Sequence, residues 1–158
     1  MSDPAAGFVK VRFKLERDED GWPPADSEGL WAEPLSDTFR IANTPWFVRN
    51  LASDDVVIAH AGSDGVLWAT GKARWSGHLT IRVLPLRDGQ GLAARQAVLD
   101  AFRPLGVEGE GVAQFGLVAL DIPPDADLAA VKELLHCGTA DGRWEYEEGC
   151  ISDAWAEP

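Results

Sequence analysis

The chain has 158 residues, of which 46% are apolar and 25% charged, enough for one ordinary domain or two very small ones. This apolar share excludes wholesale disorder, and no stretch approaches the roughly 20 apolar residues of a membrane-spanning helix. The formal net charge of −12 repels nucleic acids and anionic membrane surfaces, so we expect neither to be a partner.

The first half of the chain is expected to form strands. Residues 1–7 are small and polar, which predicts a disordered N-terminus. From Val9 to Leu15 apolar and basic residues alternate, as in a strand with one buried face. Residues 8–75 are therefore interpreted as a bent antiparallel sheet or a small β-barrel. The later strands are predicted, between turn residues, at 29–35, 38–42, 55–60, 66–74 and 78–86.

The second half alternates strands and helices. Apolar residues at helical spacing predict a helix over about 94–105, which Gly106 ends. A second helix follows, with Asp125 as its expected N-cap. The element order β-α-β-β-α-β predicts an α+β protein in which a ferredoxin-like half, residues 76–152, packs against the barrel and precedes a tail at 153–158. The strands of this half are predicted at 78–86, 107–112, 115–122 and 144–147.

The sequence carries no motif for a metal or a cofactor. Its histidines and cysteines lack the spacing of zinc ligands, and Gly109-x-Gly111 is not completed to a dinucleotide-binding motif. Two cysteines, Cys137 and Cys150, do not make a disulfide framework. The residues after Met1 lack a signal-peptide pattern, so we expect a cytoplasmic protein with no metal site and no cofactor.

A stripe of polar side chains is predicted on one face of the strand at 78–86. Alternate strand residues share a face, which brings Ser76, His78, Thr80 and Arg82 together while aliphatic residues enter the core. Same-face neighbours lie about 6–7 Å apart, too far for a direct hydrogen bond between Ser76 and His78. The stripe is therefore a surface or interface feature, a ligand contact, or a catalytic set completed by an acid from elsewhere.

Tryptophan is unusually frequent in the first half. One explanation is that these rings fill a small barrel that has few leucines and isoleucines. The other is an aromatic pocket or interaction patch near Trp22, with Trp46 partly exposed. Five of the seven tryptophans lie in this region: Trp22, Trp31, Trp46, Trp68 and Trp75.

Several short motifs in a fixed order resemble a bacterial family described as domain of unknown function 4265. The resemblance spans roughly residues 8–150 and implies no activity, cofactor or partner. It departs at Trp46, Asp54 and Leu79, where the family pattern has Phe, Gly and Ser. The motifs are Gly21-Trp22-Pro23-Pro24, Glu28-x-Leu30-Trp31-Ala32, Asn43-x-Pro45-Trp46-Phe47, Asp55-x-Val57, Ser76-Gly77-His78 with Thr80 and Arg82, and Gly142-x-Trp144-x-Tyr146-Glu147. The resemblance implies that Trp22, Glu28, Trp31, Asn43, Ser76 and His78 should be tested together.

These observations favour a non-enzymatic cytoplasmic binding protein of the immunity or accessory type, whose acidic surface engages a protein partner. From Arg87 onward 14 acidic residues face 5 basic ones, a net charge of −9, which predicts a basic partner. The alternative is a small-molecule-binding protein or enzyme with a pocket between the two halves, lined by Ser76, His78, Arg82 and tryptophans. No catalytic residue is assigned, Ser76 and His78 being the candidates. The predicted contact residues are Trp22, Glu28, Trp31, Asn43, Trp46, Ser76, His78, Thr80 and Arg82.

Overall fold

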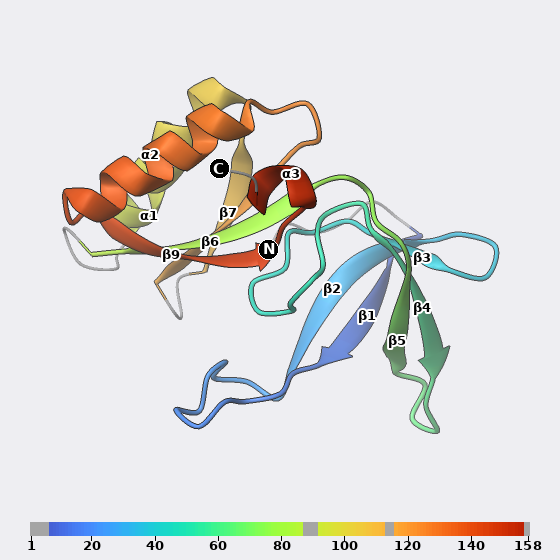
Figure 1. Cartoon of the computed structure of the whole chain (residues 1–158). Coiled ribbons are helices and arrows are strands. Elements are labelled where there is room, and N and C mark those ends of the chain that lie inside the picture. Colours follow the sequence, from blue (N-terminus) through green and yellow to red (C-terminus); the bar gives the residue numbers. More distant parts are fainter. Residues whose placement is uncertain (1–6, 87–91, 113–115, 157–158) are drawn as a thin grey trace.

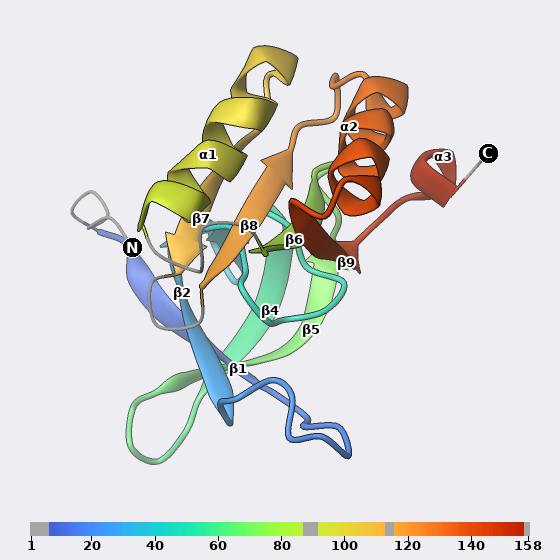
Figure 2. The ribbon, with the colours of Figure 1, turned by 90° about the vertical axis from the view of Figure 1, so that its left-hand side faces the viewer.

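A closed β-barrel lies beside a four-stranded sheet in the computed structural model, and two helices cover the far face of that sheet (Figures 1 and 2). The structure describes residues 7–86, 92–112 and 116–156. The predicted α+β class is confirmed, and the first half is a small closed barrel rather than an open bent sheet.

The barrel consists of five short strands. β1 pairs with β2 antiparallel and with β5 in parallel, and the remaining neighbours are antiparallel, so the sheet closes on itself. Alternate residues of the strands fill the interior, among them Val11, Leu30 and Ile41, each at most 1% exposed. The strands are β1 (Val9–Lys14), β2 (Ser27–Pro34), β3 (Phe39–Ile41), β4 (Val56–Ala61) and β5 (Leu67–Arg74).

The second half forms an antiparallel sheet with the order β7-β8-β6-β9. Apolar residues of its central strands and of two helices build one core, so both helices lie on the same face (Figure 1). The strands are β6 (Leu79–Pro85), β7 (Glu108–Val112), β8 (Leu117–Ile122) and β9 (Trp144–Cys150). The helical elements are α1 (Leu92–Phe102), the 3₁₀ helix η1 (Arg103–Leu105), α2 (Leu128–Ala140) and α3 (Asp153–Ala156).

β6 is the strand that joins the two halves, because both of its faces are covered. Leu79, Ile81 and Val83 enter the helix-side core, while Thr80 and Arg82 lie on the opposite face, toward the barrel. The predicted alternation of side chains is confirmed. The polar stripe itself is an interface between barrel and sheet, with Thr80 and Arg82 at most 1% exposed.

Two predictions about the ends of elements are wrong. Residues 153–156 are not a tail: they form α3, and Trp155 is 2% exposed and joins the helix-side core. The N-cap of α2 is Asp127 rather than Asp125, because the Asp127 side chain accepts a hydrogen bond from the Ala130 N–H at 3.1 Å. The predicted disorder of residues 1–6 concerns residues outside the described ranges. Within those ranges, no helix has the length and apolarity to cross a membrane.

Candidate binding site between the barrel and the sheet

The connection between β3 and β4 lies between the barrel and the sheet, and Glu28 holds it from the barrel side. Glu28 is 6% exposed and belongs to β2. Its carboxylate accepts hydrogen bonds from the backbone N–H groups of Trp46 at 2.7 Å, Phe47 at 2.9 Å and Val48 at 3.0 Å. Hydrogen bonds to a charged group are roughly twice as strong as neutral ones. Glu28 therefore orders the segment 46–48 and is satisfied by it.

Arg82 holds the same segment from the sheet side. Its guanidinium donates from Nε to the carbonyl oxygen of Trp46 and from Nη2 to that of Val48. Its Nη1 lies 3.6 Å from Oε1 of Glu147 and has no hydrogen-bond partner among the described residues. Burial lowers the pKa of Arg82, and the carboxylates of Glu147 and Glu28 oppose that change.

A glycine makes room for this buried guanidinium. A Cβ atom built on Gly149 of β9 would lie 1.8 Å from Nη1 of Arg82, so no other residue fits there without moving the arginine. Arg82 and Gly149 are more than sixty positions apart in the sequence, and the pairing of β6 with β9 brings them together. Gly149 is therefore part of the Arg82 site.

A hollow of about 160 Å³, the Trp22 pocket, lies next to Arg82. Trp22 comes from the loop between β1 and β2 and meets the ring of Phe47 edge-on at 5.5 Å. The pocket combines aromatic and aliphatic groups with carboxylates and one buried cation. Its lining residues are Trp22, Arg82, Leu84, Leu117, Glu145, Tyr146 and Glu147.

The other end of the polar stripe consists of hydrogen bonds to backbone. The hydroxyl of Ser76 donates to the carbonyl of Ser53 at 2.7 Å, and that of Thr80 donates to the carbonyl of Leu51 at 2.9 Å. Asp55, fully buried, accepts from the Ser76 N–H at 2.8 Å. These side chains attach β6 and the residues before it to the loop that precedes β4.

His78 lies between two carboxylates, one from each half. Its Nδ1 is 2.7 Å from Oδ1 of Asp121 in β8, and its Nε2 is 3.5 Å from Oδ2 of Asp54. Burial raises the pKa of Asp121, although the hydrogen bond to His78 acts in the opposite direction. The Ser76 hydroxyl accepts from the His78 backbone N–H and not from its ring, so the two do not form a nucleophile–base pair.

Trp31 and Asn43 lie away from the Trp22 pocket. The side-chain oxygen of Asn43 accepts from the Trp31 N–H at 2.9 Å, a bond that connects the start of the β3–β4 loop to β2. The Trp31 ring lies beneath the amino group of Lys10, 4.5 Å from the ring centroid. The structure thus gathers Trp22, Glu28, Trp46 and Arg82 around one segment. It leaves the other predicted residues in structural bonds elsewhere.

Sequence reasoning missed the residues that β9 contributes. Glu145 and Glu147 are two positions apart, so a period of two already predicts that they share a face. Glu147 pairs with Arg82, whereas Glu148 on the opposite face accepts from the Trp155 indole N–H. Nothing in the sequence indicated that this face would meet Trp22, from a loop more than a hundred residues away.

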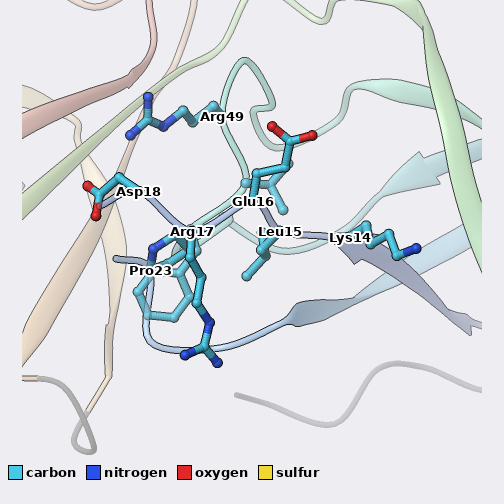
Figure 3. A pocket seen from close by; sticks show the side chains of 9 residues that line it. Lys14, Leu15, Glu16, Arg17, Asp18, Pro23 and Arg49 are labelled. Carbon is cyan, nitrogen blue, oxygen red and sulfur yellow. The ribbon is translucent and has the colours of Figure 1, made fainter. Parts of the chain in front are cut away.

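A second hollow is lined by side chains of both charges. This hollow has a volume of about 440 Å³ and lies beside the β1–β2 loop, and Figure 3 shows the guanidinium groups of Arg17 and Arg49 apart from one another. Glu16 and Asp18 also line it, so no single charge dominates. Among the residues that the structure describes, no group of three or more His, Cys, Asp or Glu is arranged to hold a metal ion.

Comparison with known proteins identifies the family. A family profile described as "Domain of unknown function (DUF4265)" matches residues 28–146. The chain belongs to this family. A search of curated proteins finds no match. A crystal structure described as a hypothetical protein from Neisseria gonorrhoeae is similar, with 20% identity and a TM-score of 0.73 over 91% of this chain and 96% of the other. At that identity the likeness shows the fold alone.

The DUF4265 match includes most of the site but not all of it. Glu28, Arg82 and Glu145 lie inside the matched residues, whereas Trp22 precedes them and Glu147 follows them. The family description names no activity.

Proposed function

We propose that this protein is a non-enzymatic cytoplasmic binding module whose acidic surface, centred on β9, engages a basic protein partner. One observation carries the proposal: Glu145, Glu147 and Glu148 lie on a strand at the end of the sheet order, and the first two line the Trp22 pocket. Carboxylates next to a half-buried aromatic side chain suit lysine and arginine side chains, which combine a charge with an alkyl stem.

The net charge supports a basic partner. The residues from Arg87 onward carry a net charge of −9 out of −12 for the whole chain. A field of this size speeds the approach of a basic protein and slows that of an acidic one. The hydroxyls of Ser76 and Thr80 bind backbone carbonyls, which supports a binding role over catalysis by the polar stripe.

The test is the salt dependence of association. Partners captured at low salt would be identified, and the association rate of each purified partner measured at rising ionic strength. We expect the rate to fall steeply, because screening removes the attraction between charges farther apart than the Debye length of about 10 Å at 0.1 M salt. A rate that stays constant would show that the acidic surface plays no part.

A second candidate function is the binding of a small molecule in the Trp22 pocket. The observation that favours it is the Nη1 atom of Arg82, which is buried and has no hydrogen-bond partner among the described residues. A ligand with an oxygen acceptor would satisfy it. Tryptophan fluorescence would be screened against metabolites in the native protein and in Trp22→Phe. A response lost in the variant supports this function, and an identical response in both excludes the pocket.

We also propose to class residues 76–152 as a ferredoxin-like domain. The order β7-β8-β6-β9, antiparallel throughout, and two helices on one face support this. An experimental structure with another strand order, or with the helices on opposite faces, would overturn it.

A further inference from the structure

We propose that the free edge of β9 receives an extended basic segment of the partner, which adds a fifth strand to the sheet. This inference rests on the proposed function and names the surface and the form of the partner. Among the described residues, β6 is the only strand that pairs with β9, and Figure 1 looks onto the other edge of β9. One loop bond lies near its end, where the Asn50 N–H donates to the carbonyl of Gly149 at 2.7 Å.

The ladder shows which backbone groups of β9 are available. The Leu86 N–H donates to the carbonyl of Arg143, so this pair of residues is hydrogen-bonded. Two residues further along each strand, Leu84 lies opposite Glu145. Because antiparallel strands alternate between residues that bond inward and outward, the peptide groups of Trp144, Tyr146 and Glu148 face away from β6. No described residue pairs with these outward groups, so they can bond a further strand.

The side chains of β9 determine the charge of that strand. Glu145 and Glu147 lie on the barrel face and Glu148 on the helix face, so a strand added at the edge meets carboxylates on both of its faces. Opposite charges on directly paired strand residues stabilise a sheet, and like charges destabilise it. A basic segment therefore fits this edge.

The same charges exclude a second copy of this chain as the occupant. Two β9 strands paired edge to edge would place the three glutamates of one copy among the three of the other. Charged residues on edge strands are a known device against such self-pairing. The charges of β9 thus disfavour pairing with a second copy of this chain and favour pairing with a basic strand.

The Trp22 pocket gives this strand an anchor. Glu145 and Glu147 line the pocket on the barrel face, where alternate side chains of an added strand would also lie. A lysine or arginine entering there packs its alkyl stem against Trp22 and places its charge beside Glu145. Glu147 already faces Arg82, so Glu145 is the carboxylate left for the partner.

The probe is a capped ten-residue peptide that alternates lysine and valine, with two control peptides. One replaces each lysine by glutamate, and the other carries N-methyl groups on alternate backbone amides, which removes donors but keeps every side chain. We expect the first peptide to bind the full chain in a salt-dependent manner and to slow amide hydrogen exchange at Trp144, Tyr146 and Glu148. The glutamate peptide should not bind, and N-methylation should weaken binding about tenfold or more.

Two protein variants with the same charge change sharpen the test. Glu145→Lys should weaken binding of the lysine–valine peptide about tenfold, since an attraction becomes a repulsion. Asp37→Lys, an exposed residue between β2 and β3 on the barrel, changes the net charge equally and should weaken binding much less. Equal effects of the two variants would overturn the proposed edge.

The outcomes separate this inference from the proposed function. Salt-dependent binding that survives N-methylation, or protection away from β9, would overturn strand addition while leaving an acidic binding surface. No binding of the lysine–valine peptide at low salt would overturn both. Protection of the same amides in the free protein at high concentration, with a dimer in ultracentrifugation, would identify a second copy as the occupant and would also overturn the proposal.

Discussion

Glu28 and Arg82 hold the same three-residue segment from opposite sides. The carboxylate of Glu28 accepts from the N–H groups of residues 46–48, and the guanidinium of Arg82 donates to the carbonyl oxygens of Trp46 and Val48. Glu28 belongs to the barrel and Arg82 to the sheet, so this segment joins the two halves. Both charges are almost fully buried, and the peptide groups between them bond the Glu28 carboxylate and the Nε and Nη2 atoms of Arg82.

Arg82→Met is expected to destabilise the protein severely. The substitution keeps an apolar stem but leaves two half-buried carbonyl oxygens without their Arg82 donors, which should lower the free energy of unfolding by about 3 kcal/mol. Urea denaturation would measure this loss. The control is Arg103→Met, at a side chain 67% exposed, which should change stability by no more than about 0.5 kcal/mol. A loss below about 1 kcal/mol for Arg82→Met would contradict the importance of these bonds.

Glu28 and Arg82 should be coupled energetically although they share no direct bond. In a double-mutant cycle of Glu28→Gln and Arg82→Met, the combined loss should differ from the sum of the single losses by about 0.5–3 kcal/mol. The reason is that either substitution already releases the segment 46–48, so the second has less to disrupt. Glu28→Gln combined with Arg103→Met serves as the control cycle and should be additive. Additivity in the first cycle would mean that the two side chains act independently.

The C-terminal helix α3 should contribute strongly to stability. Trp155 is 2% exposed, and Lys132 donates to its backbone carbonyl at 2.8 Å. Trp155→Ala should cost about 3–5 kcal/mol, since it leaves a cavity in the helix-side core. Thermal unfolding followed by circular dichroism would measure the loss. The control is Trp75→Ala, at a residue 43% exposed, which should lower the free energy of unfolding by less than half as much. If Trp155→Ala left the stability unchanged, α3 would not be packed against the core as described.

The raised pKa of Asp121 predicts a stability difference that grows with pH. Because burial raises this pKa in the folded state, the unfolded chain loses the Asp121 proton first as pH increases above the ordinary value of 3.8. The wild type therefore loses stability through that window relative to Asp121→Asn, which cannot ionise. Urea unfolding at several pH values would give the difference in free energy between the two proteins. A difference that is constant, or that shrinks as pH rises, would contradict this sign.

Glu110→Gln offers a second case of the same sign. Burial also raises the pKa of Glu110, and its Oε2 atom is buried without a hydrogen-bond partner among the described residues. This variant should therefore gain stability relative to the wild type as pH rises, without disturbing His78. If the pH-dependent change in stability relative to the wild type had opposite signs in Asp121→Asn and Glu110→Gln, the contact with His78 that Asp121→Asn breaks would be the cause.

Residues on strands show where sequence reasoning succeeds. The alternation through Leu79, Ile81 and Val83 predicted which side chains enter the core, since the two faces of a strand follow from backbone geometry alone. The same reasoning placed Thr80 and Arg82 together on the other face. It could not show that this face is covered, because the covering loop comes from residues about thirty positions earlier.

The ends of elements and the C-terminal residues show where sequence reasoning fails. Asp125 and Asp127 are equally good caps by composition, and only the direction in which the chain enters α2 selects Asp127. Residues 153–158 resemble a short polar tail. Trp155 is nevertheless buried, because α3 follows β9 directly and its indole ring packs into the helix-side core.

The sequence by itself determined the α+β class, the strand and helix order, the acidic charge and the division of side chains between faces. These depend on periodicity and composition, which are local properties of the chain. The tertiary structure alone decided that Arg82 faces peptide carbonyls, that Trp22 shares a pocket with residues of β9, and that no second strand among the described residues pairs with β9. Each of these joins segments far apart in the chain, and a contact of that kind depends on how the folded layers pack.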